Sequence, residues 1–499
     1  RDEIAPLQDA IASLETIRPT AASGKDYEYW ENMLTVYDTT VDSLYRKSQY
    51  TAALNTVEKA RSRRFLDDMG NKRLGAKGVA ASLMIQRANE NLNALAVLEA
   101  DMMKAAEQSG IKVRSFYDKD SRLGKKMENY KTVLKQASDA DQKFGVVANV
   151  VPVSVEKLQK QIPTDTTVVE YYQSEKELYI WVIDKNNITA LRQELSKDKL
   201  RKLIEQYRRS LYLDSTKRGI AITEKENADF ASLQRETYRL LIAPVEKSIK
   251  TKKICIVPYD ILNYLPFQSL HDGRGYLVEK YSLSYLPSLS VLEYLRKTQK
   301  KDNYTILAIG NPDLGDARMD LPAAGAEVDM IKDIFPQAAI YKRGQATEAT
   351  VKKDAHRYDI LHFAAHGEYK AADTLSSCLY LAPGGGEDGQ LQVGEIFDMN
   401  INADMVVTSA CQTALGKISR GDEVLGLTRA FMYAGANSVF GSLWSISDEA
   451  TAVLMKDFYT NIKTMEKSEA LQRAQLKMIR SKDYSHPFYW AAFNITGAL

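Results

Sequence analysis

The sequence predicts a multidomain α+β protein, in which a helical N-terminal region is followed by an α/β domain with a largely parallel sheet. Three observations support this prediction. The chain has 499 residues, which is more than the roughly 250–300 residues that one hydrophobic core organises. The first part of the chain, up to about residue 145, carries helical periodicity. Beyond it, short β-branched runs alternate with helical stretches.

Composition excludes several classes of protein. Hydrophobic residues make up 44% and charged residues 26% of the chain, as in an ordinary globular protein. Lysine and arginine total 67 against 65 acidic residues, a net charge of +2, which predicts neither direct nucleic-acid binding nor membrane binding. Three cysteines are too few for a disulfide framework, so we expect a reducing, cytoplasmic location. Because the chain begins with Arg1, we also expect that upstream sequence is missing.

Residues 1–70 are expected to form paired helices. Helical patterns run from Trp30 to Arg46 and from Tyr50 to Met69, joined by the short polar segment Lys47-Ser48-Gln49. Small residues at Ala53 and Ala60 would let a neighbouring helix approach closely. The pair resembles a tetratricopeptide-type hairpin, and repeats of this kind stack into surfaces that bind other proteins. We therefore expect a protein regulator to bind this region.

Residues 71–150 are expected to form a longer helical hairpin. Apolar residues recur at helical spacing in two stripes, which are Leu92, Leu95, Leu98 and Met102, and then Met127, Tyr130 and Leu134. Such stripes most simply pack against each other or onto a neighbouring domain.

The remaining residues are expected to form the α/β domain, in two halves at 151–300 and 301–499. Its β-rich runs are Thr167–Tyr172, Leu178–Ile183, Ile254–Val257, Tyr304–Ile309, Ile360–Ala364, Met405–Thr408 and Ser438–Leu443. The helical stretches between them are Asp198–Tyr212, Leu233–Ile242, Ala326–Ile334, Glu423–Tyr433 and Glu449–Ile462. Because Ile188–Leu191 follows so closely after Leu178–Ile183, these two runs are compatible with an antiparallel hairpin.

Two of the expected strands end in reactive side chains. The run Ile360–Ala364 leads to His366 and Gly367, and the run Met405–Thr408 leads to Cys411 among small and polar residues. In an open α/β sheet the carboxyl ends of parallel strands lie at one edge, where ligands bind. A cysteine is only slightly ionised at neutral pH and needs a nearby base. The sequence therefore favours a His366–Cys411 pair, with the backbone N–H groups of Gly367 and Cys411 as an oxyanion hole.

Other candidate sites have simpler interpretations. Cys255 and Cys378 lie inside apolar runs and are expected to be buried, and His362 is expected to be a hydrogen-bonded core histidine. The glycines of Pro383-Gly384-Gly385-Gly386 lack the Gly-Lys-Ser/Thr that a phosphate-binding loop requires. No spacing of cysteine and histidine suits zinc. We expect neither a metal nor an organic cofactor.

The block from about Val155 to Leu499 resembles the CHAT peptidases, which are caspase-like cysteine proteases related to separase. The segments that carry the match are Ile256-Val257-Pro258-Tyr259-Asp260, Leu265-Pro266-Phe267, Tyr285-Leu286-Pro287-Ser288, Ile309-Gly310-Asn311-Pro312, Leu321-Pro322-Ala323-Ala324, His362-Phe363-Ala364-Ala365-His366-Gly367, Ser409-Ala410-Cys411-Gln412-Thr413, Gly421-Asp422-Glu423-Val424-Leu425-Gly426-Leu427, Leu443-Trp444-Ser445-Ile446-Ser447-Asp448, His486-Pro487 and Trp490-Ala491-Ala492-Phe493. The resemblance implies a pseudo-caspase-like first half and a catalytic second half, with His366 as base and Cys411 as nucleophile. Gln412 stands where the family often has an acidic residue.

We therefore expect a cysteine endopeptidase that cleaves a protein substrate and is regulated through its helical arm. The alternative is a non-catalytic interaction scaffold that retains the fold. The resemblance to separase also implies a substrate pocket formed by Ser409, Trp444 and Asp448, with Asp448 receiving a basic side chain. For Asp448 the alternative is a helix N-cap.

Overall fold

The computed structural model describes residues 27–68, 154–216, 224–293, 295–296, 301, 303–368, 370, 374–409, 423–444 and 446–497, with a few isolated positions before residue 27 and between 125 and 136. It divides into two compact units, Arg1–Leu158 and Gln159–Leu499. The helical hairpin predicted for residues 71–150 lies outside the described residues. Among the helices that are described, none is both long and apolar enough to cross a bilayer.

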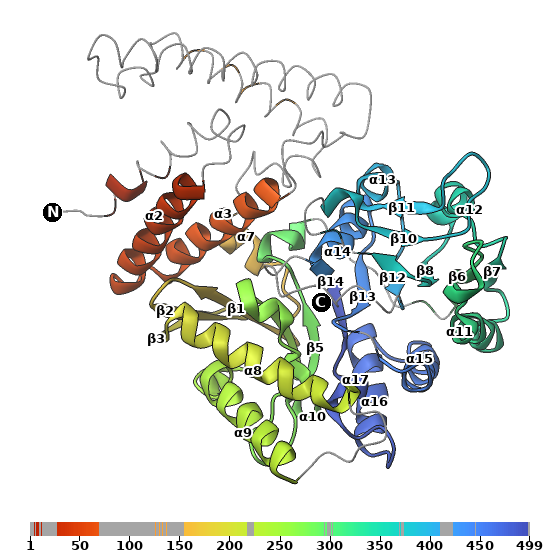
Figure 1. Ribbon diagram of the computed structural model, residues 1–499. Helices are drawn as coiled ribbons and strands as arrows, with labels where there is room; N and C mark the ends of the chain where they lie inside the picture. Colours follow the sequence, from red (N-terminus) through yellow and green to blue (C-terminus); the bar gives the residue numbers. More distant parts are fainter. Residues whose placement is uncertain are drawn as a thin grey trace. The chain divides into compact units, whose positions relative to one another are not determined.

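The first unit contains the helical pair that the sequence predicted. Helix α2 (Tyr27–Arg46) and helix α3 (Tyr50–Asp68) are joined by a tight turn in which Ser48 adopts a left-handed conformation, with φ of 59° (Figure 1). Helix α3 buries the small and apolar side chains of the predicted stripe, which are Ala53, Leu54, Val57 and Ala60. The Asn55 side chain also accepts a hydrogen bond from the Val155 N–H (2.9 Å) at the start of α7 (Val155–Gln159). The predicted pair of packed helices is therefore confirmed.

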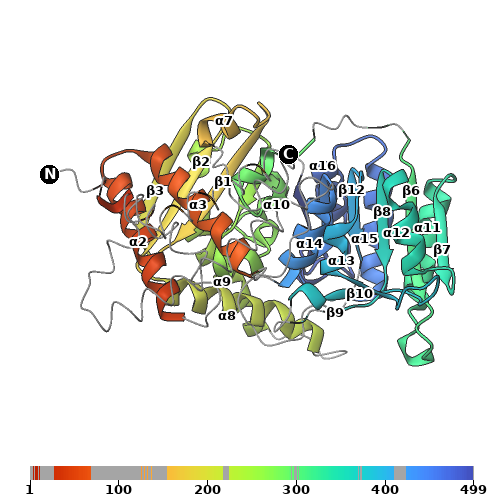
Figure 2. The ribbon, with the colours of Figure 1, turned by 90° about the horizontal axis from the view of Figure 1, so that it is seen from above.

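The second unit is built on one sheet of eleven strands, in the order β3-β2-β1-β4-β5-β14-β13-β12-β8-β6-β7. The strands of its first half are β1 (Thr166–Gln173), β2 (Glu177–Ile183), β3 (Ile188–Glu194), β4 (Lys253–Val257) and β5 (Ser282–Tyr285). Those of its second half are β6 (Ile306–Pro312), β7 (Ala339–Arg343), β8 (Ile360–Ala364), β12 (Met405–Thr408), β13 (Ser438–Ser442) and β14 (Phe493–Gly497). Figure 2 shows the sheet running from β3 at one side to β7 at the other.

Most of the pairing is parallel, as predicted. The antiparallel pairs are β1 with β2, β2 with β3, and β13 with β14. Strand β14 also pairs with β5, and this single junction joins the two halves into one continuous sheet. One apolar core runs through both halves, so they do not form separate hydrophobic cores. The predicted α+β fold with a two-part α/β domain is confirmed.

Helices cover both faces of the second half (Figure 1). One face carries α11 (Pro322–Ile334), α15 (Asp448–Asn461) and α16 (Lys467–Ile479), and the other carries α12 (Glu348–Asp354), α13 (Val393–Asp398) and α14 (Glu423–Ala434). Helix α11 approaches β6 closely because Gly310 has no side chain. A Cβ there would lie 2.6 Å from Val328 Cγ2 and 2.8 Å from Ala324 O. The first half carries α8 (Lys197–Thr216) and α9 (Glu224–Leu241).

Shorter elements complete the fold. A second sheet has three strands, β9 (Gly367–Glu368), β10 (Cys378–Tyr380) and β11 (Gln390–Gln392), in the order β11-β10-β9. Among the described residues, the remaining helices are the short α10 (Leu277–Lys280) and α17 (Pro487–Trp490), with 3₁₀ turns η2 (Glu246–Ser248), η3 (Asp260–Tyr264), η4 (Phe267–Ser269), η5 (Leu289–Glu293), η6 (Ala317–Met319), η7 (Ala355–Arg357) and η8 (Thr374–Ser376).

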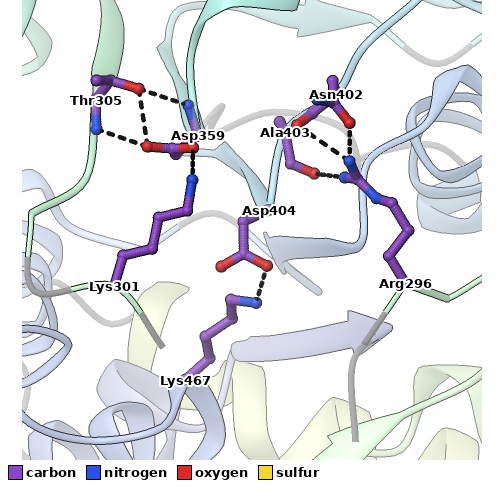
Figure 3. Close-up of polar contacts among 8 residues, drawn as sticks. All are labelled: Arg296, Lys301, Thr305, Asp359, Asn402, Ala403, Asp404 and Lys467. Atoms are coloured by element: carbon purple, nitrogen blue, oxygen red, sulfur yellow. Dashed lines mark hydrogen bonds and ion pairs between the residues drawn. The ribbon is translucent and has the colours of Figure 1, made fainter. Parts of the chain in front are cut away.

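Polar contacts secure the amino-terminal ends of the strands in the second half (Figure 3). The Asp359 carboxylate, just before β8, accepts hydrogen bonds from the Thr305 N–H (3.0 Å) and from Lys301 Nζ (2.5 Å). The Arg296 guanidinium donates to the Ala403 carbonyl (2.7 Å) just before β12. Asp404 and Lys467 form an ion pair of 2.7 Å, and their side chains are only 8% and 10% exposed. This edge lies opposite to the strand ends that lead to His366 and Cys411.

The Asp404–Lys467 pair allows the contribution of these contacts to stability to be tested. Replacing Lys467 with methionine keeps the aliphatic stem but leaves the Asp404 carboxylate buried without its counter-ion. We expect the free energy of unfolding to fall by about 3 kcal/mol, measured by urea denaturation. The matched control is Lys477→Met, because Lys477 is 69% exposed in its pair with Asp457. Loss of that pair should cost less than about 0.5 kcal/mol. Equal effects of the two substitutions would contradict the prediction.

Candidate active site

The parallel register of β8 and β12 aligns the two strands that lead to the predicted pair. Phe363 lies opposite Thr408 in this register. The Ser409 N–H then donates to the Phe363 carbonyl (2.9 Å), which extends the pairing by one residue. Cys411 lies within residues 410–422, outside the described residues. The structure therefore brings the two strand ends together and describes His366, while the place of the thiol stays a prediction.

The imidazole of His366 is held by a backbone carbonyl. Its Nε2 lies 2.9 Å from the Met319 carbonyl oxygen, at the end of η6. A carbonyl oxygen only accepts hydrogen bonds, so Nε2 carries the proton and, in the neutral ring, Nδ1 keeps the free electron pair. The side chain is half-buried. Sequence reasoning missed Met319, because a contact made by a backbone atom leaves no signal in residue type.

The residues around His366 are fixed by the small second sheet. The His366 carbonyl accepts from the Tyr380 N–H (2.9 Å), and Gly367 pairs with Leu379 of β10. Gly367 is buried at the start of β9. Its predicted contribution to an oxyanion hole, together with the Cys411 N–H, stays a prediction.

A buried polar network lies directly beneath the same strand ends. The Ser409 hydroxyl donates to Glu327 Oε2 (3.0 Å), and Glu327 Oε1 lies 3.2 Å from His362 Nε2. The other ring nitrogen of His362, Nδ1, lies 2.9 Å from the Tyr459 hydroxyl. Burial and the nearby Glu327 carboxylate hold the pKa of Tyr459 well above its usual value, so the phenol stays neutral.

This network confirms that His362 is a hydrogen-bonded core histidine, since the residue has no exposed surface. It also assigns the Ser409 hydroxyl to a contact with α11. Sequence reasoning did not single out Glu327, because a glutamate within a helical pattern usually faces solvent.

Trp444 and Asp448, the other predicted pocket residues, lie at opposite ends of a short segment after β13. The Trp444 indole is 3% exposed, and its Nε1–H donates to the Phe488 carbonyl (3.0 Å), which anchors the segment to α17. Asp448 is exposed at the start of α15. The N-cap of that helix is Ser447, whose Oγ accepts from the Ala450 N–H (3.3 Å). Capping therefore does not account for Asp448.

The surroundings of the Asp448 carboxylate disfavour its charged form. Its pKa lies above the usual value, because it is partly desolvated and because Glu449 and Glu327 place like charge nearby. Among the residues that the structure describes, Asp448 forms no ion pair. Such a carboxylate is suited to receive a cation.

The other two cysteines are buried, as predicted. Burial raises the pKa of Cys255 to about 12 and also raises the pKa of Cys378. Both thiols are therefore protonated at neutral pH and unreactive.

One acidic cluster could in principle attract a metal ion. The carboxylates of Glu348, Glu387 and Glu395 come within 4.8 Å of one another. However, Lys352 Nζ already lies among them, at 2.7, 2.7 and 2.8 Å, respectively. The cluster is thus an ion-pair network around a lysine.

Comparison with known proteins places most of the second unit in one family. The family model described as the CHAT domain matches residues 232–498, just over half of the chain. Tetratricopeptide repeat protein 28 of Mus musculus is 26% identical over 322 residues, which cover 53% of this chain and 13% of the mouse protein. The Homo sapiens protein of the same name is 26% identical over 342 residues, covering 57% of this chain and 14% of the human protein. The chain thus spans about one seventh of the length of these relatives.

Two solved structures are more distantly similar. The Saccharomyces cerevisiae separase–securin complex aligns with a TM-score of 0.47 and 11% identity, covering 92% of this chain and 37% of that chain. The Arg-specific cysteine proteinase gingipain R aligns with a TM-score of 0.33 and 9% identity, covering 60% of this chain and 74% of that chain. Similarity at this level assigns neither a fold nor an activity to this chain.

Proposed function

The chain belongs to the CHAT domain family, and from this premise we propose that it is a cysteine endopeptidase that uses His366 and Cys411. The supporting observation is the register of β8 and β12. Phe363 and Thr408 are paired, and the proposed base and nucleophile each follow their paired residue by three positions in the sequence. Two residues at equal distances beyond a parallel pair leave the sheet at the same edge.

The mechanism proposed follows from the tautomer of His366. Nδ1 accepts the thiol proton of Cys411, and the thiolate attacks the scissile carbonyl carbon. The resulting oxyanion is stabilised by the N–H groups of Gly367 and Cys411. The Nδ1–H then protonates the leaving amine, and a water molecule, deprotonated by Nδ1, releases the acyl group. The Met319 carbonyl stabilises the imidazolium through Nε2–H in each charged step.

Substitution of either member of the pair tests this proposal. We expect Cys411→Ala and His366→Ala each to abolish cleavage in a peptide library, since one removes the nucleophile and the other the base. In wild type, iodoacetamide at neutral pH should modify Cys411 faster than a free cysteine. In His366→Ala that rate should fall at least tenfold, because no histidine then accepts the thiol proton.

The buried thiols of Cys255 and Cys378 are internal controls, and they should react only after unfolding. A folded Cys411→Ala protein that still cleaves peptides would refute the assignment of Cys411 as the nucleophile. A wild-type chain in which Cys411 reacts no faster than a free cysteine and no peptide is cut would favour the interaction scaffold instead.

We further propose that the pocket for the residue before the cut involves Ser409, Trp444 and Asp448, and that Asp448 selects arginine. Its partly desolvated carboxylate, which forms no ion pair with any residue that the structure describes, supports this, because pairing with a guanidinium would relieve its repulsion from Glu327 and Glu449. The buried Trp444 indole would anchor the start of the segment that leads to Asp448.

Asp448→Asn should therefore raise the KM for peptides with arginine before the cut by tenfold or more, with a smaller change in kcat, because the bidentate ion pair is lost. Asp448 loses its charge as the pH falls through its raised pKa. In wild type the arginine preference should thus decline at a higher pH than for an ordinary aspartate. Glu449→Gln, on the neighbouring residue, is the control. Equal KM values for arginine peptides in wild type and Asp448→Asn would refute the pocket.

We also propose that a protein regulator binds the helical arm and controls the peptidase. Support comes from the α2–α3 hairpin, since helical repeats form extended protein-binding surfaces. The intact chain should then cleave peptides slowly by itself. A shortened chain that begins at Ser154 should lose any response to the regulator while keeping its fold. If this shortened chain and the intact chain respond equally, the arm is not the regulatory region.

A further inference from the structure

A strained turn at the end of β6 lies close to the contact that orients His366. Asn311 has φ of 46°, in the left-handed region, and the pairing of β6 with β7 shifts at this point, between Gly310 and Pro312. Arg343, which ends β7, also has a left-handed conformation, with φ of 52°. Bulges of this kind redirect a side chain, and residues other than glycine rarely keep such a conformation without a compensating contact.

The compensating contacts of Asn311 converge on the segment that follows Met319. Asn311 Oδ1 accepts from the Leu321 N–H (2.7 Å) and from Arg343 Nη1 (3.3 Å). Arg343 Nη1 also donates to Asp320 Oδ1 (2.5 Å). Asp320, the first residue after Met319, is therefore bound through its side chain to the end of β7. Leu321, the second, is bound through its backbone N–H to the end of β6.

On the other side of Met319, the turn is closed locally. The Met319 N–H donates to the Asp316 carbonyl (2.9 Å), and the Asp316 side chain accepts from the Arg318 N–H (2.9 Å). These contacts shape the η6 turn but do not connect it to the sheet. The connection to the sheet comes from the Asn311 amide and the Arg343 guanidinium.

We propose that Asn311 is a positioning residue, which holds the Met319 carbonyl against His366 Nε2 and thereby keeps the histidine in the tautomer with Nδ1 free. The importance of this positioning for catalysis rests on the proposed function, in which Nδ1 of His366 is the base for Cys411. The side chain is 9% exposed, so its contacts are shielded from competing water. Arg343 acts with it, at a half-exposed position where the ion pair itself adds little stability.

The tautomer of His366 gives a test that needs no substrate. The chain has five histidines, so selective ¹⁵N-histidine labelling gives few signals, and His366→Gln assigns the relevant one. At a pH where the ring is neutral, we expect wild type to show a protonated Nε2 and an unprotonated Nδ1. In Asn311→Ala the signals should shift toward a mixture of both tautomers. An unchanged Nε2–H tautomer in that variant would overturn the proposal.

Two further substitutions separate positioning from folding. Asn311→Asp keeps an acceptor for Leu321 and Arg343 and should restore the wild-type tautomer. Asn311→Gly removes the amide but also the cost of the left-handed conformation, so it should show the mixed tautomer with a thermal midpoint close to wild type. If Asn311→Gly kept the wild-type tautomer, the amide would not be the positioning group.

The matched control compares adjacent residues of β7. Lys342 and Arg343 are 40% and 43% exposed, and each pairs with an aspartate near or on α11, Asp329 and Asp320, respectively. Arg343→Ala should shift the tautomer partly, whereas Lys342→Ala should leave it unchanged. Equal shifts in the two variants would mean that a general loss of ion pairs, and not the contact with Asp320 and Asn311, is responsible.

Kinetics then connect this inference with the proposed function. With an active wild type, Asn311→Ala should lower kcat by roughly tenfold to a hundredfold and change KM much less, and Asn311→Asp should recover most of that loss. If the tautomer shifts but wild type cleaves nothing, the positioning inference stands and the proposed function fails. If wild type is active but the tautomer does not shift, the positioning inference alone fails.

Discussion

The parallel register between β8 and β12 is the constraint on which the rest of the site depends. Four pairs of residues, from Ile360 with Met405 to Phe363 with Thr408, fix how far each strand extends before it leaves the sheet. A shift of one residue would turn the side chains of one strand to the opposite face. It would bring His362 out of its buried contact with Tyr459, and it would disrupt the close packing of the apolar side chains on both faces of the two strands. Packing of the core thus determines the spacing at the strand ends.

The opposite edge of the sheet helps to keep this register. Asp359 and Asp404 stand just before β8 and β12, and the Asp404 N–H donates to the Asp359 carbonyl (2.7 Å). Each carboxylate has its own lysine, Lys301 and Lys467, respectively. These contacts prevent the two strands from sliding past each other at the end remote from His366. The chemistry at one edge is therefore supported by ion pairs at the other.

Sequence reasoning predicted β8 and β12 and, in the run Ile188–Leu191, part of the edge strand β3, but it missed β5, β7 and β14. The bounds of β8 and β12 agree with the predicted runs, because their apolar residues are selected by burial on each side. Strand β7 lies at the edge of the sheet and all five of its residues are half-buried, so no apolar pattern is required. Strand β14 pairs with β5 across more than half of the α/β domain, and nothing in local sequence predicts such a long-range pairing.

For the candidate site, too, the sequence predicted some features and missed others. The residue types and their place after strands predicted a His366–Cys411 pair, of which the structure describes His366. The Met319 carbonyl and the Asn311 bulge were missed, because a backbone acceptor and a left-handed φ depend on how distant segments meet. Glu327 was missed because only the packing of α11 against the sheet shows that its carboxylate is buried.

Helix α11 and the residues just before it contact the chain at both strand ends. Met319, just before the helix, contacts His366, and Glu327, within the helix, accepts from Ser409. An apolar side chain in place of Glu327 would fill the same space but would allow Ser409 several orientations, whereas a hydrogen bond to a carboxylate has one preferred geometry. Close packing of α11 on Gly310 leaves the helix little freedom to slide. His366 and Ser409, which follow β8 and β12, are therefore both held in place relative to the same helix.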